Sequence, residues 1–265
     1  MAAAAAPALP AFAELRAPAA WQAIDFLSDL HLADGTPRTF DALATHLRCT
    51  RADAVFILGD LFEVWLGDDA RHEGFAAAIV AMLAEASTHR VVGFMAGNRD
   101  FLVGHELLAD CGVLRLADPT LLHAFGERLL LTHGDALCLA DVSYQQFRAQ
   151  VRTDAWQREF LALPLDARQR AAGAIRAESQ RLKAGQRPQD WADVDADEAA
   201  RWLRAAGAAQ MVHGHTHRPG RHEVAPGLVR HVLSDWNLDP PGSIRADVLR
   251  WERDGLHRIA PATAA

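Results

Sequence analysis

The sequence has few cysteines, no long apolar run and no excess of positive charge, and each absence excludes a class of protein. Its three cysteines, Cys49, Cys111 and Cys138, are scattered and form no C-x-x-C pair. This argues against a disulfide framework and favours a reducing cytoplasm. No apolar run is long enough to cross a bilayer. The formal net charge of −7 disfavours nonspecific binding to nucleic acid over the whole surface.

What is present suits one large globular domain. The chain has 265 residues, of which 50% are apolar, and this is enough to bury a sizeable core. Residues 1–20 are rich in alanine and proline but have no cationic stretch ahead of an apolar core. We therefore expect a disordered N-terminal tail rather than a signal peptide, followed by one domain over residues 21–265.

Strands and helices are expected to alternate along the domain. Apolar runs that end at polar or glycine residues predict five buried strands, over residues 21–27, 54–58, 90–95, 129–131 and 211–212. Helical spacing predicts helices over residues 39–48 and 75–86. This alternation predicts a layered α/β domain, in which ligands gather at the carboxyl ends of the strands.

Residues 141–190 differ from the rest of the chain, because they contain no strand-like run. They resemble two or more helices broken at Leu163-Pro164, where proline ends or kinks a helix. Between Asp141 and Arg187 there are nine Arg or Lys residues against five acids, a balance of +4, which leaves −11 for the remainder. Such a basic insertion usually marks a solvated helical face, but it can also mark an anionic partner.

Five polar clusters follow the five expected strands. They are Asp29-Leu30-His31, Gly59-Asp60, Gly97-Asn98-Arg99-Asp100, Thr132-His133-Gly134-Asp135 and Gly214-His215-Thr216-His217. Carboxylates and neutral imidazoles suit Mn²⁺, Fe²⁺ or Zn²⁺, and the set contains no soft thiolate. Each cluster alone has an ordinary explanation as a turn or a surface histidine, but five behind buried strands indicate a metal site. We interpret His213 as a strand-end residue and not as a ligand.

The ordered clusters resemble those of the calcineurin-like metallophosphoesterases, over about residues 26–219. The resemblance implies an α/β fold with a layered β-sandwich flanked by helices, and a dinuclear site that in bacterial members usually holds two Mn²⁺. By motif position, one ion would be held by Asp29, His31, Asp60 and His217. The other would be held by Asp60 as the bridge, Asn98, His133 and His215. A water activated by both ions would be the nucleophile.

Arg99 stands where most of the superfamily has a histidine that acts as an acid. Arginine cannot give up a proton at neutral pH, but its guanidinium fork suits the charge that develops on phosphate oxygens. This fits a phosphoanhydride, whose phosphate leaving group needs little protonation, better than an alkyl ester. We therefore expect a nucleotide-type diphosphate as the substrate, with Arg99, Asn98 and His215 as the catalytic residues.

Within the superfamily, the chain is similar to the family of UDP-2,3-diacylglucosamine pyrophosphatases. The similarity rests on residues 59–63, 65–69, 97–101, 131–135 and 214–219, and on residues 160–165 within the insertion. It implies hydrolysis of the diphosphate to UMP and 2,3-diacylglucosamine 1-phosphate (lipid X) in lipid A biosynthesis, and it makes the insertion, at about residues 141–190, a helical lid. The substrate contacts of the family map onto Asn98, Arg99, Asp141, Ser179, Lys183, Gln186 and His215.

The lid departs from the family pattern at two of these positions. The family has an amide and then a lysine, four and seven residues after the serine, whereas here Lys183 comes first and Gln186 second, with Arg187 adjacent. Which cation would meet the substrate phosphate is therefore left open. A solvated helix face is the alternative for Ser179, Lys183 and Gln186.

The basic lid suggests a partner and a location. A basic insertion with an apolar stripe could receive acyl chains and lie against anionic lipid, so we expect a cytoplasmic protein that is peripheral on the inner membrane. The alternative is that these residues only cover the core. No nucleic acid and no obligate protein partner are implied.

Other functions remain open from the sequence. The nearest is a dinuclear-metal nucleotide pyrophosphatase or phosphodiesterase that acts on a soluble substrate. A nuclease or a protein phosphatase is disfavoured by the acidic charge and by the missing histidine at position 99. A scaffold with vestigial metals would have lost some ligands, and all seven are present.

Overall fold

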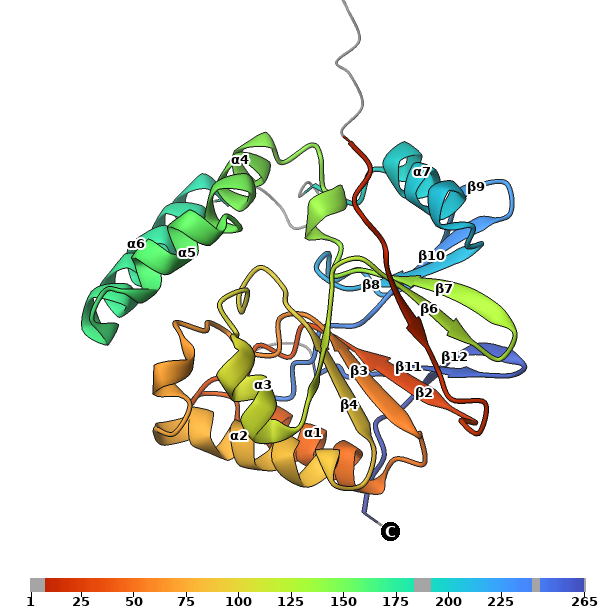
Figure 1. Cartoon of the computed structure of the whole chain (residues 1–265), viewed down its shortest axis with the longest axis horizontal. Coiled ribbons are helices and arrows are strands. Elements are labelled where there is room, and N and C mark those ends of the chain that lie inside the picture. Colours follow the sequence, from red (N-terminus) through yellow and green to blue (C-terminus); the bar gives the residue numbers. More distant parts are fainter. Residues whose placement is uncertain (1–7, 184–191, 240–243, 265) are drawn as a thin grey trace, which may run out of the picture.

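The computed structural model describes residues 8–183, 192–239 and 244–264, with the backbone alone at residues 179–180 and 182–183 (Figure 1). Two six-stranded mixed sheets form the body of the molecule. The first sheet has the order β12 (Gly255–Ile259), β11 (Val248–Glu252), β2 (Ile24–Leu27), β3 (Ala54–Leu58), β4 (Val91–Met95) and β5 (Leu114–Leu116). The second has the order β1 (Ala13–Arg16), β6 (Thr120–Ala124), β7 (Glu127–Leu131), β8 (Gln210–His213), β10 (Leu228–Val232) and β9 (Gly220–Ala225).

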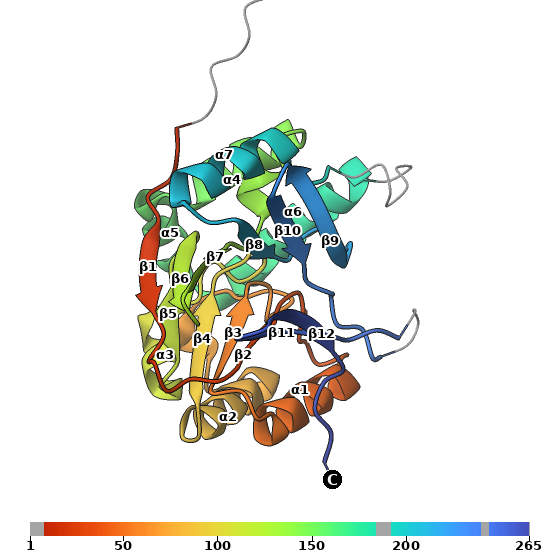
Figure 2. The same ribbon diagram turned by 90° about the vertical axis from the view of Figure 1, so that its right-hand side faces the viewer.

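Helices cover the outer faces of both sheets (Figure 2). The first sheet is covered by α1 (Pro37–Cys49), α2 (Gly74–Ser87) and α3 (His105–Cys111), whose apolar side chains pack on it. The second sheet is covered by α7 (Ala196–Ala206). A third apolar cluster fills the space between the sheets, including Phe26, Phe56, Leu129 and Val212. The structure is therefore a β-sandwich flanked by helices, and the predicted fold class is confirmed.

The parallel strands explain the continuous apolar runs in the sequence. Strands β2, β3, β4 and β5 pair in parallel, with Phe26 beside Phe56 in the register. In β2, Phe26 faces the second sheet whereas Leu27 faces the helices. Strands buried on both faces lose the alternation of polar and apolar residues. The strands predicted over residues 21–27, 54–58, 90–95, 129–131 and 211–212 are found as β2, β3, β4, β7 and β8, and both predicted helices are found, with some ends shifted by up to three residues.

The predicted disordered tail over residues 1–20 is wrong for its second half. Residues 13–16 form β1, which pairs in parallel with β6, for example Leu15 with Leu122. Leu15 also packs against the apolar cluster between the sheets. Backbone hydrogen bonds to β6 order this segment. Such bonds do not depend on apolar side chains, so no apolar run in the sequence predicts this strand. Residues 1–7 lie outside the described residues.

The insertion predicted to be a lid contains α4 (Val142–Val151), α5 (Asp154–Leu161) and α6 (Leu165–Lys183), which lie together to one side of the two sheets (Figure 1). The break between α5 and α6 falls at Leu163-Pro164, as predicted. The remainder of the predicted insertion, up to about residue 190, lies outside the described residues. Within the part of the chain that the structure describes, no helix is both long and apolar enough to cross a membrane.

Candidate metal centre

All five polar clusters follow the carboxyl ends of strands, β2, β3 and β4 in the first sheet and β7 and β8 in the second. The backbone at these ends is strained. Six described residues other than glycine have a positive φ, and five of them are predicted metal ligands: Asp29, His31, Asp60, His215 and His217. Non-glycine residues in this region cost free energy and cluster at functional sites. The strain therefore marks the same residues as the sequence motifs do.

The seven predicted ligands form one continuous series of contacts. Asp60 Oδ1 lies 3.7 Å from His133 Nε2, which lies 3.0 Å from Asn98 Oδ1. Asn98 Oδ1 also lies 2.7 Å from His215 Nδ1. The backbone N–H of His215 donates to the Asp29 carboxylate, at 3.0 Å from Oδ2. His217 Nε2 completes the series, 3.4 Å from Asp29 Oδ1 and 3.3 Å from His31 Nε2.

The hydrogen bonds of His133 orient one of its nitrogens toward this centre. Its Nδ1–H donates to the Leu58 carbonyl at 2.9 Å, so Nε2 carries the lone pair of the neutral ring. Nε2 and Asn98 Oδ1 are then two acceptors 3.0 Å apart, which repel each other unless a proton or a metal ion lies between them. The donor set thus fits a divalent metal.

Electrostatics at His133 also favour a positive charge at this place. Burial alone would lower the pKa of His133, but nearby carboxylates, Asp60 first among them, outweigh burial and raise the pKa to about 9. Burial lowers the pKa of His215 to about 3, with the charge of His133 adding to the effect. In the chain without metal, His215 is therefore neutral, the form in which imidazole binds metals.

Three groups of described side chains have the spacing to hold a metal ion; one, Glu252, Asp254 and His257, lies at the turn between β11 and β12, and the other two lie at this centre. The first of these two is Asp29, His31 and His217, and the second is Asp29, Asp60 and His133, with the ligand atoms of each group within 4.8 Å of one another. Asp29 belongs to both groups, whereas the family resemblance makes Asp60 the bridging residue. Ionised carboxylates suit this position, and the pKa of Asp29 is well below its usual value: burial opposes ionisation, but the hydrogen bond from His217 and the charges of the histidines outweigh it.

Asp100 supports the centre and was given no role by the sequence analysis. Its buried carboxylate accepts hydrogen bonds from the backbone N–H groups of Leu61 and Gly97, both at 2.8 Å, and from those of Asp60 and Phe62 at 3.3 Å. It thereby joins the loop after β3 to the loop after β4. A Cβ atom at Gly97 would collide with the Asp60 carboxylate, so only glycine fits this close approach.

Glu63 is a second residue to which the sequence motifs assign no role. Its carboxylate lies 3.2 Å from His31 Nδ1 and 3.4 Å from Arg99 Nη1, and it forms an ion pair with Arg176 of α6. The Arg99 side chain is 38% exposed, so a substrate can reach it. Glu63 therefore links a predicted metal ligand, the predicted phosphate-binding arginine and the lid.

The lid reaches the centre through Tyr144, the single tyrosine of the chain. Its ring stacks on His215, with centroids 5.9 Å apart, and its hydroxyl donates to Asp135 Oδ2 at 2.5 Å. Asp135 also accepts from Arg148 Nε at 2.8 Å. No local sequence pattern indicated this contact, because Tyr144 and His215 lie far apart in the chain.

The structure does not test the predicted substrate contacts in the helical insertion. Asp141 is the N-cap of α4 and accepts from Tyr144 N at 3.0 Å, which is an ordinary capping role. The side chains of Ser179 and Lys183, and all of Gln186, lie outside the described residues. His213, predicted to be an ordinary strand-end residue, ends β8 and contacts the Gly214 carbonyl through Nδ1 at 2.9 Å.

Comparison with known proteins identifies the class to which this fold and site correspond. The chain belongs to the calcineurin-like phosphoesterase family, whose model matches residues 23–219. Membership of a metallophosphoesterase family implies divalent metal ions, and the two groups of side chains above could hold them.

The curated relatives are more specific. The chain is 43% identical, over 227 residues, to the UDP-2,3-diacylglucosamine hydrolase of Chromobacterium violaceum, covering 85% of this chain and 95% of the relative. It is 40% identical, over 244 residues, to the enzyme of the same name from Stenotrophomonas maltophilia, covering 88% and 98%. Both levels of the predicted resemblance are confirmed. Among solved structures, the phosphoesterase Yfce of E. coli is 14% identical with a TM-score of 0.44, covering 91% of this chain and 100% of Yfce.

Proposed function

We propose that this chain hydrolyses the diphosphate bond of UDP-2,3-diacylglucosamine, releasing UMP and 2,3-diacylglucosamine 1-phosphate in lipid A biosynthesis. The observation that carries the proposal is the 43% identity to a UDP-2,3-diacylglucosamine hydrolase over 85% of this chain. The contacts among the seven predicted metal ligands support it, because a catalytic centre requires them to converge.

Membership of the family implies divalent metal ions, and our proposal adds the identity of the metal, the number of ions and the residues that hold them. We propose two Mn²⁺ ions, one at Asp29, His31, Asp60 and His217, and one at Asp60, Asn98, His133 and His215. When bound, such a pair lowers the pKa of a water and offsets the charge of the phosphate oxygens. The chain supplies a set of carboxylate, imidazole and amide donors without thiolates, which suits this metal.

The side chains around the centre have separate roles in this proposal. The partly exposed Arg99 offers a charged fork to the substrate phosphate, and Glu63 holds its guanidinium near His31. Asn98 adds a neutral oxygen, so it adds no repulsion toward the phosphate. His215, which stacks on the ring of Tyr144, stays neutral beside the substrate diphosphate. Ser179, Lys183 and Gln186 complete the proposed substrate contacts by family position, with Asp141 at the start of the lid.

The test of the substrate is product release from two UDP-sugars. We expect UMP from UDP-2,3-diacylglucosamine and very little from UDP-glucose. Turnover in ¹⁸O-labelled water should place the label in UMP if the water attacks the phosphorus nearer the uridine. Equal turnover of both sugars would instead favour the alternative, a nucleotide pyrophosphatase or phosphodiesterase with a soluble substrate.

We also propose that the lid receives the acyl chains and lies on the anionic inner-membrane surface facing the cytoplasm. Val142, Leu161, Leu163 and Ile175 are exposed large apolar residues on or between its helices. Exposed cations, among them Arg158, Arg170 and Arg181, would meet the lipid phosphates. Changing these three arginines to glutamine should reduce pelleting with anionic liposomes, whereas changing them to lysine should not. Equal pelleting of both variants would contradict the membrane role.

A further inference from the structure

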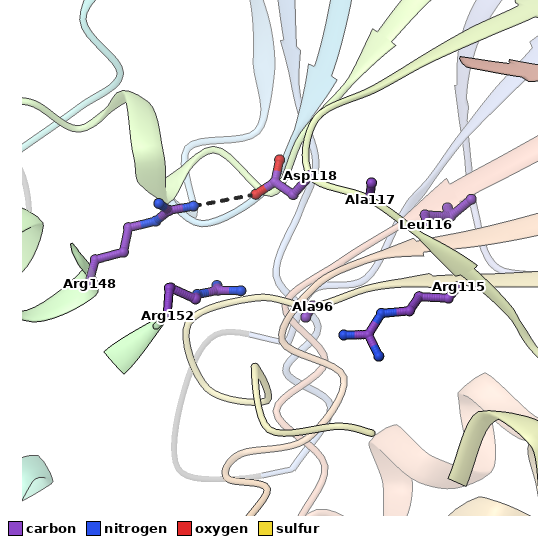
Figure 3. Close-up of a pocket in the computed structure, with 7 residues that line it drawn as sticks. All are labelled: Ala96, Arg115, Leu116, Ala117, Asp118, Arg148 and Arg152. Carbon is purple, nitrogen blue, oxygen red and sulfur yellow. Dashed lines mark ion pairs between the residues drawn. The ribbon is translucent and has the colours of Figure 1, made fainter. Parts of the chain in front are cut away.

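A cavity of about 260 Å³ lies at the end of β4, where Ala96 lines it (Figure 3). Its wall combines the end of β4, the segment that joins β5 to β6, and helix α4 of the lid. The lining residues are Ala96, Arg115, Leu116, Ala117, Asp118, Arg148 and Arg152. We call it the arginine cavity. It adjoins the centre through Arg152, whose Nη2 donates to the Gly97 carbonyl at 2.8 Å.

Three guanidinium groups from distant parts of the chain converge on this cavity. Arg148 of α4 and Arg152, the residue that follows α4, enter from one side, and Arg115 enters from the opposite wall (Figure 3). Arg148 binds Asp135 through Nε at 2.8 Å, and among the described residues its two Nη atoms donate no hydrogen bond. Arg115 is exposed and forms no ion pair with any described residue. Several guanidinium donors are therefore free to bind an anion.

The charge balance of the wall is positive. Asp135 and Asp118 are the two carboxylates near the three arginines, with Asp118 Oδ2 at 3.9 Å from Arg148 Nη2. Arg148 and Arg152 both pair with Asp135, the latter through Nη2 at 3.7 Å from Oδ2, so three cations against two anions leave one unbalanced positive charge, and Arg115 is the arginine without an ion pair among the described residues. Arginine forks bind phosphate oxygens in a bidentate manner. A cavity of this size, just below that of drug-sized sites, suits a phosphate with a small organic group.

Asp118 adds a second requirement on the ligand. Its Oδ1 accepts from Thr132 Oγ at 2.6 Å, but its Oδ2 is buried without a hydrogen-bond partner in the described structure. A buried acceptor without a partner is costly. A ligand that carries a hydroxyl group beside its phosphate would satisfy this oxygen while the arginines bind the anion.

We propose that the arginine cavity is a second ligand site, which binds a phosphate monoester carrying a hydroxyl group. The phosphate lies between Arg115 and Arg152, and the hydroxyl donates to Asp118 Oδ2. Both products of the proposed reaction belong to this class of compound, but so do free nucleotides and sugar phosphates. Binding here needs neither metal nor turnover, so it is tested independently of the proposed function.

The experiment is calorimetric titration of the full chain, kept metal-free with a chelator. The probes are UMP, glucosamine 1-phosphate, inorganic phosphate and uridine, so that nucleotide and sugar sources are separated. We expect saturable binding of at least one of the two monoesters, and weaker binding of inorganic phosphate and uridine. Arg115→Gln should weaken monoester binding about tenfold or more, as expected for a charge-assisted contact.

The matched control is Arg253→Gln, which removes an exposed arginine at the turn between β11 and β12. It should bind the monoester as the wild type does. Both variants should keep the turnover of the metal-loaded enzyme, since neither residue belongs to the metal centre. The proposal is overturned if neither monoester binds saturably, if uridine or inorganic phosphate binds as tightly, or if Arg115→Gln leaves the affinity unchanged.

Discussion

Glu63 connects three cationic or metal-binding side chains through one partly buried carboxylate. Burial alone would raise its pKa, but the hydrogen bond with His31 and the charges of Arg99 and Arg176 outweigh burial and hold the pKa below its usual value. Glu63 therefore stays ionised near neutral pH. An ionised Glu63 restrains Arg99 in one region beside the centre, and such preorganised charge is what stabilises a transition state.

Arg99→Ala should lower kcat by about 10²–10³-fold, because one stabiliser of the charge on the phosphate oxygens is lost. Arg99→Lys should recover only part of this loss, since lysine provides a point charge without the fork. Steady-state kinetics on the diacylated substrate measure both effects, with Arg253→Gln as the control. Wild-type activity in Arg99→Ala would show that this residue has no role in the chemistry.

The lid is an element attached by a few specific anchors. Arg168 of α6 is only 2% exposed and forms an ion pair with Asp69 on the core domain. Its Nη1 also donates to the Leu66 carbonyl. Trp156 of α5 packs on Phe101, with ring centroids 6.1 Å apart. The position of the lid over the centre thus depends on charge pairing as well as on apolar contact.

Substitution of Asp69 and substitution of Arg168 should lower the free energy of unfolding by different amounts. Asp69→Ala leaves a buried guanidinium without its carboxylate, and we expect a loss of about 1–3 kcal/mol in the free energy of unfolding. Arg168→Met removes the buried charge and keeps most of the volume, so its loss should be smaller. Urea unfolding monitored by circular dichroism compares the two variants. A larger loss in Arg168→Met would mean that the pair contributes mainly through packing.

At the scale of the whole molecule, a buried ionic cluster joins the two ends of the described chain. Asp25 of β2 accepts from Arg250 of β11, at 2.7 Å from Nε, and from Thr50 Oγ at 2.6 Å. Nε2 of His46 in α1 lies 3.3 Å from Asp25 Oδ2. Burial alone would raise the pKa of Asp25, but these hydrogen bonds outweigh it and lower the pKa to about 2.

Asp25 should make stability depend on pH in acid. Its pKa of about 2 in the folded protein lies below the usual value of 3.8, so the stabilisation is complete above pH 4 and is lost as pH falls toward 2. The size of this contribution is about 2 kcal/mol. The free energy of unfolding of the wild type and Asp25→Asn, measured in urea from pH 2 to 6, should converge toward the acid end. A difference that does not change with pH would contradict this role.

Metal removal should affect both activity and stability. A chelator should abolish turnover, and Mn²⁺ at about 100 times its Kd should restore it while adding about 2.7 kcal/mol of stability. For a domain of this size that corresponds to a rise in Tm of about 5–10 °C.

Asp60→Ala is the control for the metal experiment, because it removes a carboxylate from the centre. It should be inactive, and its Tm should respond less to Mn²⁺ in differential scanning calorimetry. An Asp60→Ala variant with the full Tm response would place the metal elsewhere.

Local patterns were sufficient to predict five of the twelve described strands and the polar clusters that follow them. Strands buried on both faces, such as β3 and β4, appear as continuous apolar runs, and the polar residues after them lie at the strand ends by chain connectivity alone. Strands β1, β5, β6 and β9–β12 were not predicted. All seven lie at or next to a sheet edge, and most are short or partly exposed, although β6 and β10 are largely buried. Their order depends on hydrogen bonds to neighbouring strands, which no local pattern reports.

Tertiary structure decided which side chains meet. Residue types and spacing predicted Asp29 and His217 as metal ligands, because the chemistry of a ligand belongs to the residue itself. The contacts of Glu63 with Arg176, of Tyr144 with His215, and of Arg115 with the cavity that Arg152 also lines join residues far apart in the chain. Periodicity in the sequence indicates which face of an element is buried but not which residues pack against that face. These contacts could therefore not be predicted from the sequence, because they form only when the sheets and helices α4–α6 pack together.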